Sequence, residues 1–121
     1  SGEVPYTTFM MRKDTIENEP GFAAAFVRAI YRAQKWVWAA GDEEVAYAMQ
    51  SYFPDTDIAT LSAVAKSYRA TDSWTKVPTM TEDAFTRLQD ILDGAGELAA
   101  RIELSELVDN SFGEAAISEI G

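Results

Sequence analysis

Neighbouring carboxylates are the first residues in this chain whose types and spacing could do chemistry. Asp42, Glu43 and Glu44 follow one another and could be interpreted as oxygen ligands of a hard cation. Adjacent residues of a helix point in different directions, however, and acidic residues in a first helical turn stabilise the helix dipole. We therefore interpret this cluster as the start of a helix and predict no metal site.

The stretch PDTDIATLSAV, residues 54–64, is superficially similar to a calcium-binding loop. A loop of that type has a central glycine and closes with a bidentate glutamate at a fixed offset. This stretch has neither, so we reject a calcium site here.

The residue types that the chain lacks limit the catalysis it could perform. Its 121 residues include no histidine and no cysteine, which removes the commonest general base near neutral pH, thiolate chemistry and disulfides. Carboxylate, lysine or tyrosine catalysis stays open, but no lysine lies in a convincing apolar pattern. We expect no catalytic residues, no cofactor and no enzymatic activity. The lysines that would have to be tested are Lys13, Lys35, Lys66 and Lys76.

Hydroxyl and aromatic side chains could instead bind a ligand. Tyr6, Thr7 and Thr8 offer hydroxyl groups in an extended segment, although tyrosine and threonine in a strand need no function. Trp74 lies in a polar loop, where no periodicity requires an apolar residue. A loop tryptophan is either an anchor for the loop or a wall of a binding site, and we favour the anchor.

The charge balance disfavours two classes of partner. Twenty acidic and ten basic residues give a net charge of −10. Contacts with a nucleic-acid backbone or an anionic membrane need clustered lysine and arginine, so we expect neither partner. A hydrophobic share of 47% is typical of a globular protein. We predict one domain over residues 3–121, preceded by Ser1-Gly2, which resembles a cloning scar.

Apolar periodicity predicts four main helices that must position these side chains. Pro20 lies in the first turn of the longest helix, and Gly41 ends it. Asp42, Asp57 and Thr81 are the expected caps of the following three helices. Short helical pieces are expected after these, one capped by Ser105 and one over residues 111–120.

One strand is predicted, in VPYTTFMM from Val4 to Met11. A lone strand leaves its backbone groups unpaired, so it must pair either with a second copy or with a sheet outside this chain. The predicted fold class is mostly α: an irregular helical domain of four main helices, short C-terminal helices and one N-terminal strand.

The order of these pieces resembles the C-terminal part of solute-binding proteins of ABC importers, in the nitrate/sulfonate/taurine and thiamine-precursor (pyrimidine)-binding-like family. That family has a proline-led strand, a helix ending in a tryptophan-rich stretch, and a loop tryptophan before a Thr- or Ser-capped helix. The residues that carry the resemblance are VPYTTFMMRKDTIENEP, GFAAAFVRAIYRAQKWVWAAGDEEVA, SYFPDTDIATLSAVAKSYRATDSWTKVPTMTEDAFTRLQDILDGAGEL and LVDNSF.

The resemblance implies that the chain is a C-terminal fragment of a two-lobed α/β periplasmic-binding-protein-like fold. Such proteins bind a small-molecule solute between their lobes and deliver it to a membrane permease. The implied location is periplasmic or extracytoplasmic, with membrane association through the transporter. The implied ligand-binding residues are Tyr6, Thr7 and Thr8, nearest the hinge, and then Trp74. No motif identifies the solute.

A fragment of this kind should expose the surface that met the missing lobes. We therefore expect it to form homo-oligomers, for example by strand pairing, and to bind the solute weakly or not at all. One rival interpretation is a self-contained helical protein–protein interaction domain, with residues 4–11 as an arm. The other is an enzyme of the related pyrimidine-synthesis branch, which the absence of histidine disfavours.

Overall fold

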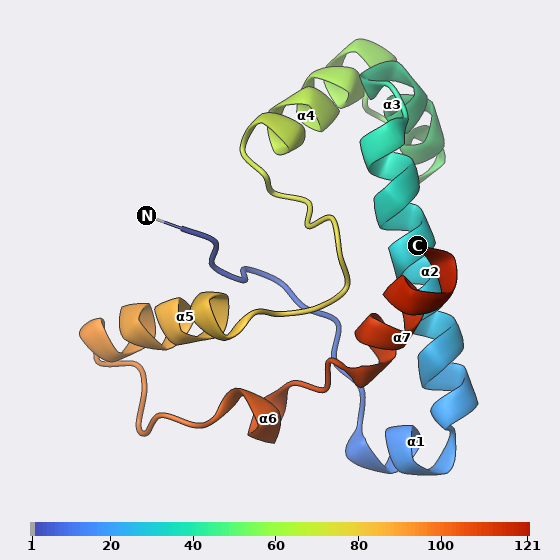
Figure 1. Cartoon of the computed structure of the whole chain (residues 1–121). Coiled ribbons are helices and arrows are strands. Elements are labelled where there is room, and N and C mark those ends of the chain that lie inside the picture. Colours follow the sequence, from blue (N-terminus) through green and yellow to red (C-terminus); the bar gives the residue numbers. More distant parts are fainter. Residues whose placement is uncertain (1) are drawn as a thin grey trace.

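The computed structural model describes residues 2–121 as an open array of helices joined by long irregular segments (Figure 1). No strand occurs within these residues, so the prediction of a mostly helical chain is confirmed. None of the described helices is long and apolar enough to cross a membrane. The elements are α1 (Lys13–Asn18), α2 (Pro20–Ala39), α3 (Asp42–Met49), the 3-10 helix η1 (Gln50–Tyr52), α4 (Ile58–Ala70), α5 (Glu82–Gly94), α6 (Leu104–Leu107) and α7 (Ser111–Ile120).

Local capping explains where two of the main helices begin. The Asp57 carboxylate accepts a hydrogen bond from the Thr60 N–H at 2.7 Å, and α4 follows. The Thr81 hydroxyl accepts one from the Ala84 N–H at 3.2 Å, and α5 follows. Both caps are confirmed as predicted, because each depends only on residues within one helical turn.

Two predicted caps are wrong by one or two residues. Gly41 rather than Asp42 precedes α3, and the Glu44 carboxylate accepts a hydrogen bond from the Gly41 N–H at 2.9 Å. Glu103 rather than Ser105 precedes α6, because its N–H donates to the Glu106 carboxylate at 2.8 Å. In both cases the carboxylate of the glutamate three residues later accepts a hydrogen bond from the backbone N–H of the residue before the helix.

The predicted strand from Val4 to Met11 is not formed, and this prediction is wrong for the chain as described. Residues 4–11 are extended, but none of their backbone groups has a backbone hydrogen-bond partner within residues 2–121. A strand exists only beside a neighbour, and the described part of the chain offers none. The segment is held instead by Phe9, which packs edge-on against Phe26 of α2 with ring centroids 5.2 Å apart. Tyr6 is 98% exposed.

The apolar packing is divided between two places. At one end of α2, helices α3 and α4 pack together around a small buried cluster of Ala40, Val45 and Ala65. Along its length, α2 packs against α7, and α1 packs beside its start. Helices α5 and α6 form a separate arm (Figure 1), in which Gln89 both donates to and accepts from the backbone of Ile102, at 3.1 and 2.9 Å.

An irregular segment, residues 75–80, joins these parts, and we call it the strap. The Gln34 amide of α2 donates to the Thr75 hydroxyl at 2.8 Å and to the Val77 carbonyl at 3.3 Å. The Asn110 side chain, just before α7, accepts from the Met80 N–H at 2.9 Å and donates to its carbonyl at 2.8 Å. The strap therefore binds both α2 and the start of α7.

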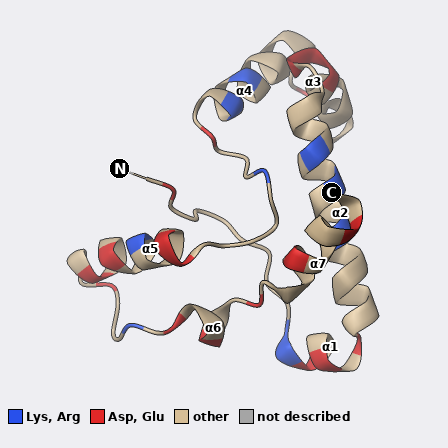
Figure 2. Cartoon of the chain, viewed as in Figure 1, with Lys and Arg blue, Asp and Glu red and all other residues tan. Residues whose placement is uncertain are grey.

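Acidic residues are spread over the helices, including α1, α3, α5 and α6 (Figure 2). Basic side chains are interspersed among them, and ion pairs such as that of Arg101 with Asp90 at 2.7 Å lie in exposed positions. Exposed pairs contribute about 0–1 kcal/mol each, so they do not decide the arrangement of the helices.

Replacing Gly113 by alanine should destabilise the protein. A Cβ atom there would lie well inside contact distance of the Pro78 carbonyl oxygen and 2.8 Å from Thr79 Cγ2. Overpacking of this kind costs about 1–3 kcal/mol. Gly21→Ala is the matched control, because a Cβ there meets nothing within 4 Å and alanine favours the helix by about 1 kcal/mol. Urea unfolding, followed by circular dichroism, should give a lower midpoint for Gly113→Ala than for the original chain, whereas Gly21→Ala should not lower it. Equal midpoints for Gly113→Ala and the original chain would contradict the close approach of Gly113 to Pro78.

The Asp57 cap should make stability depend on pH. The hydrogen bond from the Thr60 N–H lowers the pKa of Asp57. Its stabilisation is therefore fully present above the unfolded-state pKa of about 3.9 and is lost as pH falls through the lower folded-state pKa. Asp57→Asn keeps a capping oxygen but does not titrate. The melting temperature of the original chain, relative to that of Asp57→Asn, should fall as pH is lowered from 7 to 2. Parallel pH profiles would show that the carboxylate contributes nothing as a charged cap.

Candidate functional site

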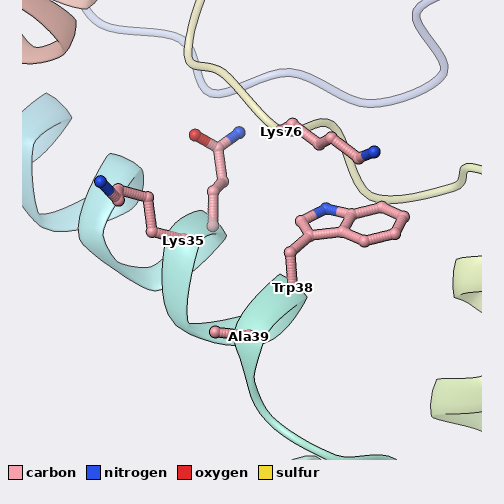
Figure 3. A pocket seen from close by; sticks show the side chains of 5 residues that line it. Lys35, Trp38, Ala39 and Lys76 are labelled. Atoms are coloured by element: carbon pink, nitrogen blue, oxygen red, sulfur yellow. The ribbon is translucent and has the colours of Figure 1, made fainter. Parts of the chain in front are cut away.

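A surface hollow of about 340 Å³ lies beside the C-terminal half of α2 (Figure 3). Four of its lining residues come from α2 at helical spacing, which places them on neighbouring faces of the helix. The fifth comes from the strap. The lining residues are Gln34, Lys35, Trp38, Ala39 and Lys76.

The two lysines of the hollow have different partners. The Lys76 ammonium lies 4.5 Å from the centroid of the Trp38 ring, a cation–π contact worth about 0.5–1 kcal/mol at an exposed site. Lys35 points away from that ring (Figure 3), and its ammonium donates to the Gly121 carbonyl oxygen. Lys76 is therefore the cation that faces the indole.

Two polar atoms of the hollow are shielded from solvent and have no hydrogen-bond partner in the described chain: Gln34 Oε1 and Trp38 Nε1. The orientation of the Gln34 amide is fixed, because the reversed amide would place Oε1 against the Val77 carbonyl that now accepts from Nε2. An unpartnered buried polar group costs about 1–3 kcal/mol. Two residues that line the hollow, four positions apart on α2, therefore carry an acceptor and a donor that have no partner and are shielded from solvent.

The polar groups of these lining residues are of kinds that could hold an oxygen-bearing small molecule. An indole N–H, an amide oxygen and an ammonium can each bind a ligand oxygen or hydroxyl. Within residues 2–121, no group of three or more acidic side chains is placed to hold a metal ion. The acidic cluster at Asp42, Glu43 and Glu44 lies in the first turn of α3, as predicted for helix-stabilising acids.

The ligand-binding residues expected from the resemblance lie elsewhere. Thr7 and Thr8, with Phe9, line a second and smaller depression of about 140 Å³. Tyr6 extends into solvent beside them. A binding role for Tyr6, Thr7 and Thr8 stays a prediction.

Trp74 lines neither of these two depressions. It packs against the buried cluster of Ala40, Val45 and Ala65 and meets the Tyr68 ring edge-on, with ring centroids 5.3 Å apart. Trp74 therefore anchors the polar loop that follows α4, which explains why an apolar residue occurs there. Its role in ligand binding stays a prediction.

Sequence reasoning did not find the hollow. The spacing of Gln34 and Trp38, four residues apart, places both on one side of a helix and could have indicated it. Lys76 follows no period, however, and its position over Trp38 depends on the path of the strap.

Comparison with known proteins finds a similarity to a binding protein. The chain is 34% identical over 119 residues to the "Putative binding protein YtlA" of Bacillus subtilis (strain 168). The alignment covers 98% of this chain and 36% of the relative, so the chain spans about a third of the relative's length. No protein-family model matches, and no solved structure gives a significant match. The chain is therefore similar to a binding protein along nearly all of its length, and its assignment to the importer receptors stays a prediction.

Trp74→Ala should lower the free energy of unfolding by about 2 kcal/mol. That loss is smaller than the roughly 3–5 kcal/mol for a fully buried aromatic residue, because Trp74 is only partly buried. Trp36→Ala is the control: Trp36 is 45% exposed on α2, and its loss should cost less than about 1 kcal/mol. The two variants can be compared by urea unfolding. An unchanged midpoint for Trp74→Ala would contradict the anchoring role.

Proposed function

We propose that this chain is the C-terminal part of the substrate-binding component of an ABC importer, and that it binds without catalysing a reaction. The observation that carries the proposal is the similarity to a binding protein over 98% of this chain but only 36% of the relative. The chain then corresponds to about one third of a larger receptor. From the resemblance to the importer family, the solute would be nitrate, a sulfonate such as taurine, or a pyrimidine precursor of thiamine.

The exposed apolar side chains support a larger receptor. Exposed apolar side chains that gather at one place on a soluble protein usually mark an interface, and Tyr6, Phe9 and Met10 lie close together in the sequence. Here large side chains are more than half exposed on the N-terminal segment, at the turn between α3 and α4, and on α6. They include Tyr6, Phe9, Met10, Tyr52 and Leu107. The remaining two thirds of the receptor would cover part of this surface.

The extended segment has the properties of a strand without its neighbour. Within residues 2–121, the backbone groups of residues 4–11 have no backbone hydrogen-bond partner, and their side chains are largely exposed. In the receptor, this segment would join a sheet contributed by the other part of the protein and would place Tyr6, Thr7 and Thr8 at the hinge, beside the solute. Trp74 is the second candidate for a wall of that cleft. The receptor would work in the periplasm or another extracytoplasmic location, where it meets the membrane permease.

The rival function is a self-contained helical interaction domain. Such a domain should have a polar surface apart from one binding face and should be a stable monomer. Large apolar side chains exposed at several separate places favour the receptor. We also propose that the chain alone forms oligomers through its exposed apolar side chains. A mass of 13.3 kDa in sedimentation equilibrium, which is that of the monomer, would contradict this.

Solute binding should require more than these 121 residues. The test compares this chain with the longer product of the reading frame that encodes it, by calorimetry against nitrate, taurine, alkanesulfonates and thiamine pyrimidine precursors. One solute should bind the longer protein, and none should bind the chain alone. Tyr6→Phe should weaken that binding roughly threefold to tenfold, as for one lost hydrogen bond.

Tyr52→Phe provides the matched control, because Tyr52 is also exposed but lies in η1, away from the proposed hinge. It should leave the affinity unchanged. Micromolar solute binding by the chain alone would contradict the proposal, as would a longer protein that binds none of these solutes.

A further inference from the structure

We propose that the hollow formed by Gln34, Trp38 and Lys76 binds a small oxyanion that also carries its own hydrogen-bond donor, such as hydrogen phosphate or a hydroxycarboxylate. The inference does not depend on the importer role, because all three residues belong to this chain. It concerns a different place from Tyr6, Thr7 and Thr8, which line or flank the other depression.

The free hydrogen-bonding atoms of the hollow define the class of ligand. Trp38 Nε1 can only donate, and Gln34 Oε1 can only accept. A ligand that satisfies both must present an acceptor and a donor close together. An oxyanion with an O–H group does so, whereas an anion without a proton leaves Gln34 Oε1 unpartnered.

The charge of the hollow favours an anion. The chain has twenty acidic residues, yet none of the five residues that line the hollow is acidic, and two are lysines. Lys35 is engaged with the Gly121 carbonyl, so Lys76 is the cation that would pair with the ligand. A hydrogen bond from an ammonium to an oxyanion is stronger than one between neutral groups.

A ligand can reach the two unpartnered atoms only when side chains around them move, and we infer that Lys76 is one of these. Gln34 Oε1 and Trp38 Nε1 are both shielded from solvent in this structure. Lys76 is exposed and lies beside the indole (Figure 3). When its chain swings off the ring, its ammonium can contact the oxyanion while the indole N–H donates to the same ligand.

The test follows the indole N–H resonances of the chain by NMR at about pH 6 and constant ionic strength. Inorganic phosphate at this pH is mostly the protonated monoanion, whereas sulfate carries no proton. Phosphate should shift the Trp38 indole resonance saturably and leave that of Trp36 in place. Sulfate should bind at least about fivefold more weakly. Trp38→Phe assigns the resonance.

Substitutions of lysine distinguish binding of phosphate in the hollow from a general attraction of the anion to positive charge. Lys76→Gln should weaken phosphate binding about tenfold, and Lys76→Arg, which keeps the charge, should retain most of it. Lys66→Gln removes an exposed lysine of α4 outside the hollow and should have no effect. The proposal is overturned if the Trp38 resonance does not shift saturably, if Lys76→Gln binds as well as the original chain, or if sulfate binds as tightly as phosphate.

Discussion

The rest of the structure depends on how the polar backbone of the strap, residues 75–80, is held. An irregular segment cannot satisfy its own N–H and C=O groups, so side chains from elsewhere must do so. Gln34 binds it from α2, and Asn110 pairs with both backbone groups of Met80. The absence of a side chain at Gly113 lets α7 approach the Pro78 carbonyl. These contacts hold the strap, which connects α4 to α5 along the chain, against α2 and α7.

The same segment creates the candidate site. Lys76 lies between Thr75 and Val77, the two strap residues that accept from Gln34, and this places its ammonium over Trp38. The donation from Gln34 Nε2 also fixes the orientation of the amide and leaves Oε1 without a partner in the described chain. The hollow is therefore a consequence of the way the strap is bound, and a change in the strap would alter the fold and the site together.

Those parts of the fold that depend on local chemistry could be predicted from the sequence. The starts of α2, α4 and α5 follow from Pro20, Asp57 and Thr81 acting within one turn. The short helix α1 was missed, and its N-cap residue Arg12 makes no capping hydrogen bond through its side chain. The predicted strand is wrong here because a strand requires a partner, which no local pattern can supply. The hollow was missed because it depends on contacts between residues about 40 positions apart, such as Gln34 and Thr75.

The central claim is that this chain is one part of a larger binding protein, which supplies the missing neighbour of residues 4–11. Hydrogen exchange of the backbone amides in that segment tests it most directly, because exchange reports whether an N–H is paired. These amides should exchange rapidly in the chain alone and about a hundredfold or more slowly in the longer protein. Equally rapid exchange in both would contradict it, because the segment would then have no partner in the larger protein either.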